Sequence, residues 1–332
     1  MIENIASEKK LKLNIPKTAK VGIAFAIICL FWSTYDFVVP LLLENAYGLS
    51  NTWRGLIMGL DNLLALFMLP LFGKLSDAAK GKLVNKMGRR TPFILIGTIA
   101  ATLCMVFIPV AAKSQAVHSD ALRQDYLLEM SENPEVLKAR LESFYGDSRY
   151  CDQDYLKTNN ISKEQYVNIK YNHVQKDGIF KKTYTYNGNP ITAEEYAELN
   201  KENGDYNKFV ASGMKVWISE RVNDQVINTK TGRSSLISYM CILLVCLLAM
   251  ATFRSPAVAL MPDVTPKPLR SPANAIINLA GGIGSALAFV IYTVTLWQNS
   301  PNNFIIIFAT VACTMLLLLA LFMVLVNERK MV

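Results

Sequence analysis

Six apolar runs of about 20 residues recur along this 332-residue chain and constrain its fold more than any other feature. A helix of that length crosses the hydrocarbon core of a bilayer, which is roughly 30 Å thick. The runs therefore predict an all-α polytopic membrane protein with six transmembrane helices. Their predicted positions are residues 21–43, 53–72, 92–112, 235–253, 273–297 and 304–326.

The runs divide the chain into three segments. Residues 1–112 hold a basic leader and the first three predicted helices, and residues 235–332 hold the last three. Residues 113–234, which we call the insert, are charged, rich in Tyr and Asn, and too long to be a simple connection.

Charge is distributed unevenly along the chain, whose net charge is +8. The insert contains 17 basic and 18 acidic residues, whereas the rest contains 17 basic and only 8 acidic residues. The excess falls in the leader, in residues 73–92 and 254–270, and in the tail. Lys and Arg accumulate in loops that stay in the cytoplasm. We therefore expect a cytoplasmic amino terminus and an extracellular insert, and no nucleic-acid partner.

Residues 73–92, which we call the latch loop, are the most basic of these connections. They contain six Lys and Arg residues and a single acid, Asp77, which ends the helix that enters the loop. Arg89 and Arg90 come just before Pro92, which suits the first turn of the next helix because no N–H is needed there. The latch loop is predicted to be a short charged connection between two antiparallel helices.

A second basic connection follows the predicted fourth helix, which ends at Phe253. It contains four prolines, which break helices. Arg254, Asp263 and Arg270 are candidates for bracing this connection against the latch loop. The alternative is that both arginines only hold the connection on the cytoplasmic side.

Two acids inside the predicted spans are the main candidates for a binding site. Asp36 follows Tyr35 and shares a helix face with Trp32, and Asp61 precedes Asn62 in the second span. Both acids are expected about 10–12 Å below the membrane surface, where a carboxylate normally faces water or a partner. These five residues are candidates for binding a proton, a cation or sugar hydroxyls. The alternative is a pair of protonated acids that are satisfied by neighbouring side chains or reach the surface.

The insert is predicted to be a small α+β domain. Apolar periodicity predicts helices over residues 121–144 and 209–226. Asn187-Gly188 favours a tight hairpin turn, and Thr192-Ala-Glu-Glu195 is a capping box that opens another helix. Aromatic residues of the insert, such as Trp217, are expected in its core rather than on a sugar-binding surface.

Small residues recur in the fifth span, from Ala280 to Gly284 and at Ala288. Such residues let two helices approach closely inside a membrane. We expect them to serve helix packing, with a glycine-lined transport path as the alternative.

Cysteine and histidine patterns give no indication of chemistry. Five of the six cysteines lie in the apolar spans, and neither histidine neighbours a cysteine. The spans contain no metal-binding His pair, Ser–His constellation or phosphate-binding loop. We therefore expect no enzyme, no cofactor and no metal site.

The latch loop also resembles a known motif. Residues 73–77 (Gly-Lys-Leu-Ser-Asp) followed by residues 88–90 (Gly-Arg-Arg) resemble the loop signature of the major facilitator superfamily of transporters. The long spacer is like that of the sucrose and glycoside–cation symporter branches. Residues 254–275 resemble the loop between helices four and five of sucrose-type symporters. The resemblance implies a conformational gating role for Gly73, Asp77, Gly88, Arg89 and Arg90.

The superfamily fold has two six-helix halves around a central cavity and works by alternating access. The six spans match the first half, so the resemblance implies a further six-helix half, with the chain's end starting the central cytoplasmic linker. It also implies a cell-membrane transporter for secondary active uptake of a sugar or glycoside, coupled to a proton or cation. Alternatives are another small metabolite or drug as cargo, or a membrane-anchored receptor that acts through the insert.

The chain departs from these branches where coupling residues are expected. Plant sucrose symporters carry an acid in helix four at the position of Leu247. Melibiose-type carriers carry paired acids in helix two at the positions of Ala65 and Leu69. Coupling by a cation is therefore not implied by matching residues, and Asp36 and Asp61 are the remaining candidates.

Overall fold

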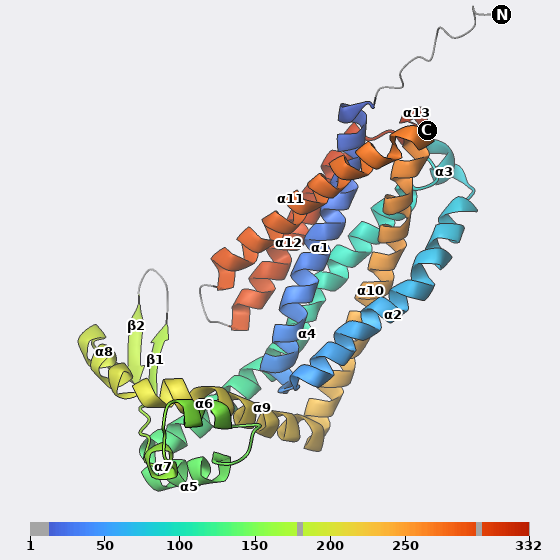
Figure 1. The fold of residues 1–332 in the computed structure, drawn as a ribbon. Helices are drawn as coiled ribbons and strands as arrows, with labels where there is room; N and C mark the ends of the chain where they lie inside the picture. Colours follow the sequence, from blue (N-terminus) through green and yellow to red (C-terminus); the bar gives the residue numbers. More distant parts are fainter. Residues whose placement is uncertain (1–12, 178–181, 297–300, 332) are drawn as a thin grey trace, which may run out of the picture.

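The computed structural model describes residues 13–177, 182–296 and 301–331, and the side chains of Asp61, Leu296, Pro301 and Asn302 lie outside this description. Among the described residues, six helices are long and apolar enough to cross a membrane. Figure 1 shows them as one bundle, with the insert at one end and two short helices, α3 (Lys82–Met87) and α13 (Glu328–Met331), at the other. The six helices are α1 (Ile15–Tyr47), α2 (Asn51–Asp77), α4 (Thr91–Glu132), α10 (Lys230–Val264), α11 (Arg270–Leu296) and α12 (Pro301–Leu325).

Helix α1 lies at the centre of the bundle and packs against α4, α10, α11 and α12. Most of its apolar side chains are buried, including Leu30, Phe31 and Val38, whereas Phe37 is exposed. Helix α2 lies at an edge, beside α10 (Figure 1). It leaves large apolar side chains such as Leu63 and Phe67 exposed.

Close packing of α1 on α11 confirms the role expected for the small residues of the fifth span. Gly284 lies against the backbone of Ala26, and Gly281 lies against Cys29. Any side chain at Gly284 would overlap the α1 backbone. Gly282, by contrast, faces open space. Packing is therefore the structural role of Gly281 and Gly284 in this bundle.

Two predicted helix boundaries in the first part of the chain are wrong: the start of the first helix and the end of the third. Both helices continue into polar residues beyond their apolar runs. The leader is helical from Ile15, where the Asn14 side chain accepts a hydrogen bond from the Lys17 amide at 3.0 Å. Helix α4 does not stop at residue 112 but continues to Glu132. The first part of the insert is therefore an extension of a membrane helix.

The predicted end of the fourth helix at Phe253 is also wrong. Helix α10 continues through Pro256 and Pro262 and stops only at Val264. Helices of membrane proteins tolerate internal prolines when neighbouring groups satisfy the freed backbone carbonyls. The chain turns at Pro266, before a 3₁₀ turn (Lys267–Leu269) and α11.

The insert combines short helices with one small sheet, as predicted. Strands β1 (Val174–Asp177), β2 (Thr183–Tyr186) and β3 (Asn189–Ile191) form an antiparallel sheet in that order. The turn between β2 and β3 confirms the predicted hairpin, because Asn187 and Gly188 both have positive φ. The helices are α5 (Pro134–Phe144), α6 (Gln153–Thr158), α7 (Lys163–Val167), α8 (Ala193–Glu202) and α9 (Ala211–Asn228), with a π-helical turn at Tyr206–Val210.

Local signals in the insert are confirmed in part. The Thr192 capping box opens α8, with both reciprocal hydrogen bonds formed. The helix predicted over 121–144 is instead divided at Asn133, because the residue before Pro134 is disfavoured in helical conformation. Trp217 is buried and contacts the Tyr126 ring and the Arg140 guanidinium, which confirms its predicted place in the core.

Candidate functional site

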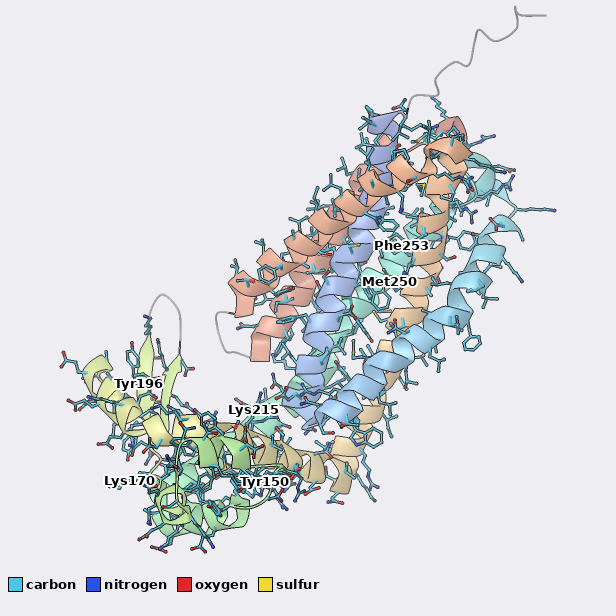
Figure 2. All side chains as sticks on the ribbon, viewed as in Figure 1. Tyr150, Lys170, Tyr196, Lys215, Met250 and Phe253 are labelled. Carbon is cyan, nitrogen blue, oxygen red and sulfur yellow. The ribbon has the colours of Figure 1, made fainter. Side chains whose placement is uncertain are left out.

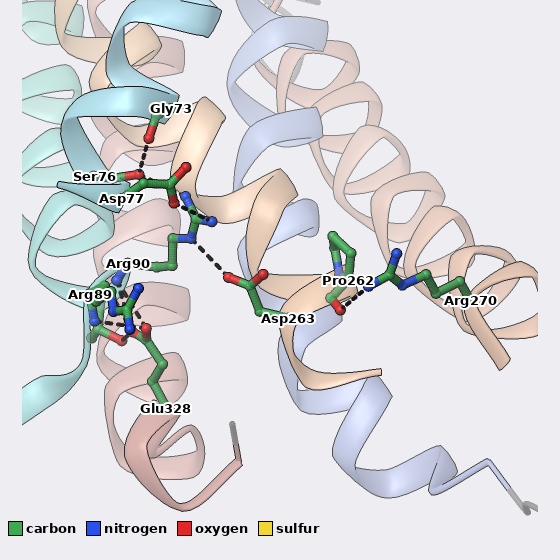
Figure 3. A network of polar contacts seen from close by, with 10 residues as sticks. Gly73, Ser76, Asp77, Arg89, Arg90, Pro262, Asp263, Arg270 and Glu328 are labelled. Atoms are coloured by element: carbon green, nitrogen blue, oxygen red, sulfur yellow. Dashed lines mark hydrogen bonds and ion pairs between the residues drawn. The ribbon is translucent and has the colours of Figure 1, made fainter. Parts of the chain in front are cut away.

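Arg90 connects three parts of the chain at the end of the bundle that holds α3 and α13. Its side chain is buried, and its Nη2 lies 2.7 Å from the Asp77 carboxylate at the end of α2. Its Nε lies 3.0 Å from Asp263 near the end of α10, and its Nη1 donates to Ser76 Oγ at 2.8 Å. The planar guanidinium therefore holds the ends of α2 and α10 together through separate donors (Figure 3).

Glu328, on α13, is a member of this network that the sequence did not indicate. Its carboxylate accepts hydrogen bonds from the amides of Arg89 (2.8 Å), Arg90 (3.0 Å) and Thr91 (2.8 Å), and from Thr91 Oγ1 (2.7 Å). These amides are the free N–H groups at the start of α4, where a negative charge is favourable. Glu328 therefore ties the end of the chain to the latch loop.

The remaining latch residues take smaller parts. Gly88 has a φ of 104°, and a Cβ there would overlap the Glu328 side chain, so only glycine suits the position. Gly73 contributes its carbonyl, which accepts from Ser76 Oγ at 2.9 Å. Arg89 contributes its backbone amide, and its side chain is exposed.

Arg270 and Arg254 lie apart from the latch network. Arg270 donates to the carbonyls of Pro262 (2.9 Å) and Thr265 (3.4 Å). It therefore caps the carboxyl-terminal end of α10. Arg254 lies inside α10, ten residues before Val264 or about 15 Å along the helix. Arg254 is a candidate for bracing or for anchoring the connection only if the helix ends before it. The structure places this cation within the span instead.

Arg254 forms a second polar cluster with α1. Its guanidinium lies over the Trp32 ring, 5.2 Å from the ring centroid, which is a cation–π arrangement. Asp36 lies one turn further along α1 and is exposed. It forms no ion pair with Arg254 among the described residues, and the charge of Arg254 acts on its carboxylate only over a longer distance. Trp32 and Arg254 line a small hollow between α1, α2 and α10. Its other lining residues are Leu64, Ala65, Met68, Leu69, Leu247 and Ala251.

The other predicted binding residues differ in placement. Tyr35 is buried inside the bundle and packs on Phe31 and Trp32, with ring centroids 5.8 and 5.7 Å apart. Asn62 is exposed on α2. The backbone of Asp61 belongs to α2, but its side chain lies outside the described part, so its predicted approach to Asp36 stays a prediction.

Among the residues that the structure describes, there is no group of three or more His, Cys, Asp or Glu side chains that could hold a metal ion. The structure thus brings together Asp77, Arg90 and Asp263 at one end of the bundle and Trp32 and Arg254 within it, with Asp36 one helical turn from Trp32. Comparison with protein-family models, with curated proteins and with solved structures found no match to this chain.

Proposed function

We propose that the chain belongs to a secondary active membrane transporter that takes up a small solute, a sugar or glycoside, at the Trp32–Asp36–Arg254 cluster. The observation that carries the proposal is this cluster of two opposite charges and an indole ring within membrane-length helices. Ionisable groups at such depth are costly, and they commonly line a path for substrates or ions.

The chemistry of the cluster suits a polyhydroxylated solute. The apolar face of a sugar ring can lie on the Trp32 indole, while Arg254 donates to its hydroxyls and Asp36 accepts from them. Leu247, Ala65 and Leu69 line the same hollow. These are the positions at which the resembling symporters carry their coupling acids. This agreement supports the hollow as the solute path, with Asp36 as the group that takes up the coupling proton or cation.

The latch network supports the second part of the proposal, a conformational cycle. Arg90 joins α2 to α10 through carboxylates that are 60% and 38% exposed, so solvent can compete for both ion pairs. Breaking them would let the ends of these helices separate. We propose that the latch end faces the cytoplasm, as its basic residues favour, and that a second six-helix half completes the cavity.

The test is uptake of labelled sugars by the complete gene product in membrane vesicles. We expect Arg254→Gln to lower initial uptake about tenfold, because one charged hydrogen bond contributes roughly 1.4 kcal/mol. Asp36→Asn is expected to keep downhill exchange and lose uphill accumulation. Lys267→Gln, which removes an exposed cation near the same helix, is the matched control.

Two outcomes would contradict the proposal. Wild-type uptake by Arg254→Gln and Asp36→Asn, with both variants present in the membrane, would exclude the cluster as the solute site. Competition by unlabelled non-sugar metabolites, without competition by sugars, would keep a transporter but change its cargo.

A further inference from the structure

The carbonyl groups at the end of α1 are capped by side chains of the insert. A helix leaves its final carbonyls without partners inside the helix. Ser119 and Arg123, on the extension of α4, and Asn223, on α9, provide these partners. Arg123 donates to Glu44 O (2.9 Å) and Asn45 O (2.6 Å), Ser119 donates to Ala46 O (2.6 Å), and Asn223 donates to Tyr47 O (3.0 Å).

Ion pairs of Glu44 add a second connection at the same junction. One oxygen of this mostly buried carboxylate lies 2.6 Å from Lys215 Nζ on α9, and the other lies 2.5 Å from Arg54 Nη1 at the start of α2. Figure 2 shows Lys215 where the insert meets the bundle. Gly48, with a φ of 63°, lets the chain turn directly against Ser219 and Asn223. The end of α1 and the insert are therefore held by side chains, charges and backbone contact together.

Helices α1 and α4 both run toward this junction, and each contains an internal proline before reaching it. Pro40 lies six residues, or about 9 Å, before Ala46 in α1. Pro109 lies ten residues, or about 15 Å, before Ser119 in α4. Each proline lacks the N–H that would bind the carbonyl four residues earlier, so each helix is weakened at that point. Because Ser119 contacts Ala46, the depths of the two weak points beneath the insert differ by about 6 Å, or roughly one helical turn.

We propose that residues 41–50 (the end of α1 and the turn after it) and residues 110–228 (the end of α4 and the insert as far as α9) form one rigid unit. This unit moves against the rest of the bundle by bending at Pro40, at Pro109 and at Thr229, the residue between α9 and α10. Trp32 and Asp36 then lie on the other side of the hinge from Glu44. In the proposed transport cycle, on which this last step rests, the insert would move with the ends of the helices and would not open as a separate lid.

Distances between spin labels test the proposal in the purified full chain, with the exposed Cys241 and Cys313 replaced by serine. One label pair, at positions 50 and 198, lies within the rigid unit and its turn. The other, at positions 80 and 198, spans the hinge. We expect one narrow distance for the first pair and two populations for the second. The double variant Pro40→Ala/Pro109→Ala should lose the second population.

Two further variants complete the test. Ser119→Ala/Asn223→Ala removes capping bonds and should broaden the 50–198 distance. Pro256→Ala, which changes a proline of α10 at the far end of the bundle, should leave both distributions unchanged. The proposal would be overturned by a broad distance distribution between positions 50 and 198 in the wild type. It would also be overturned if Pro40→Ala/Pro109→Ala left the distribution between positions 80 and 198 unchanged. These distances need no transported solute, so their failure is distinct from a failure of the uptake assay.

Discussion

A single carboxylate, that of Glu328, satisfies three backbone amides and one hydroxyl at the start of α4. It is 5% exposed, so water cannot easily replace it. Its loss would leave several buried donors without partners, and each such donor costs about 1–3 kcal/mol. The junction between the latch loop and the end of the chain therefore depends on this residue more than on the neighbouring cations.

We predict that Glu328→Ala lowers the free energy of unfolding by about 4 kcal/mol or more, because the four donors lose their acceptor at about 1–3 kcal/mol each. Glu328→Gln keeps one acceptor oxygen but replaces the other with an NH2 group, which cannot accept from an amide, and it also loses the charge beside the helix dipole. It should therefore cost about 2 kcal/mol, less than the alanine variant. Thermal unfolding in detergent measures both. Lys330→Ala is the control, since this neighbouring side chain is exposed. Equal stability of Glu328→Ala and the control would contradict the prediction.

His173 gives the insert a pH-dependent stability. Its ring is buried, Nε2 lies 2.8 Å from Gln124 Oε1, and Nδ1 has no hydrogen-bond partner among the described residues. Burial lowers the pKa of His173 below its ordinary value of 6.5. The unfolded chain then binds a proton more readily than the folded chain. Stability from this group is therefore present above pH 6.5 and is lost as the pH falls below it.

We predict that the free energy of unfolding falls by at most about 1.4 kcal/mol per pH unit from this group as the pH is lowered from 6.5. His173→Gln should remove this part of the slope. His118→Gln, at an exposed histidine, is the matched control. Chemical unfolding followed by tryptophan fluorescence measures it, because Trp217 lies in the core of the insert. An unchanged slope in His173→Gln would refute the assignment.

Among the elements, α11 offers a direct test of helix packing. Gly284 contacts the backbone of Ala26, whereas Gly282 on the same helix faces open space. We predict that Gly284→Ala lowers the free energy of unfolding by about 1–3 kcal/mol, because α1 and α11 must move apart. Gly282→Ala should be neutral or raise it by up to about 1 kcal/mol. Melting temperatures in detergent compare the two variants, and equal values would mean that α11 does not pack as described.

Sequence patterns predicted the six long helices well but not where they end. An apolar run marks the part of a helix that suits lipid, and α4 and α10 continue beyond it into polar residues. The misplaced end at Phe253 also put Arg254 in a loop, although this residue lies within α10 beside Trp32. The environment of Arg254 is set by Trp32, which is its neighbour in space but lies far from it in the sequence.

The latch shows the same limit. Asp77 and Arg90, which form an ion pair, both belong to the loop motif that the sequence singles out, and Asp263 was a candidate for bracing that loop. Glu328 lies 238 residues from Arg90 in the sequence. It is followed by Arg329 and Lys330, so the sequence shows a basic tail and gives no sign of an acceptor for the latch loop. Only the folding of α12 back to the latch loop brings it there.

At the scale of the whole molecule, the latch loop and the insert lie at opposite ends of the bundle (Figure 1). If the six helices cross a membrane, these ends must face different compartments. The basic residues of the latch loop favour the cytoplasm, which leaves the insert outside. Helices α4 and α10 run without a break from the bundle into the insert. The insert therefore lies on the side of the membrane at which these two helices leave the lipid.

We therefore predict that single cysteines at positions 82 and 155 react with a membrane-impermeant reagent from opposite sides of the membrane. Both side chains, Lys82 on α3 and Tyr155 on α6, are exposed, so a lack of reaction cannot be due to burial. In intact cells only Tyr155→Cys should be labelled, and Lys82→Cys should be labelled only after the membrane is opened. The reverse pattern would keep the six crossings and invert their orientation. Labelling of both from one side would mean that the bundle does not span the membrane, because an odd number of crossings separates the two positions.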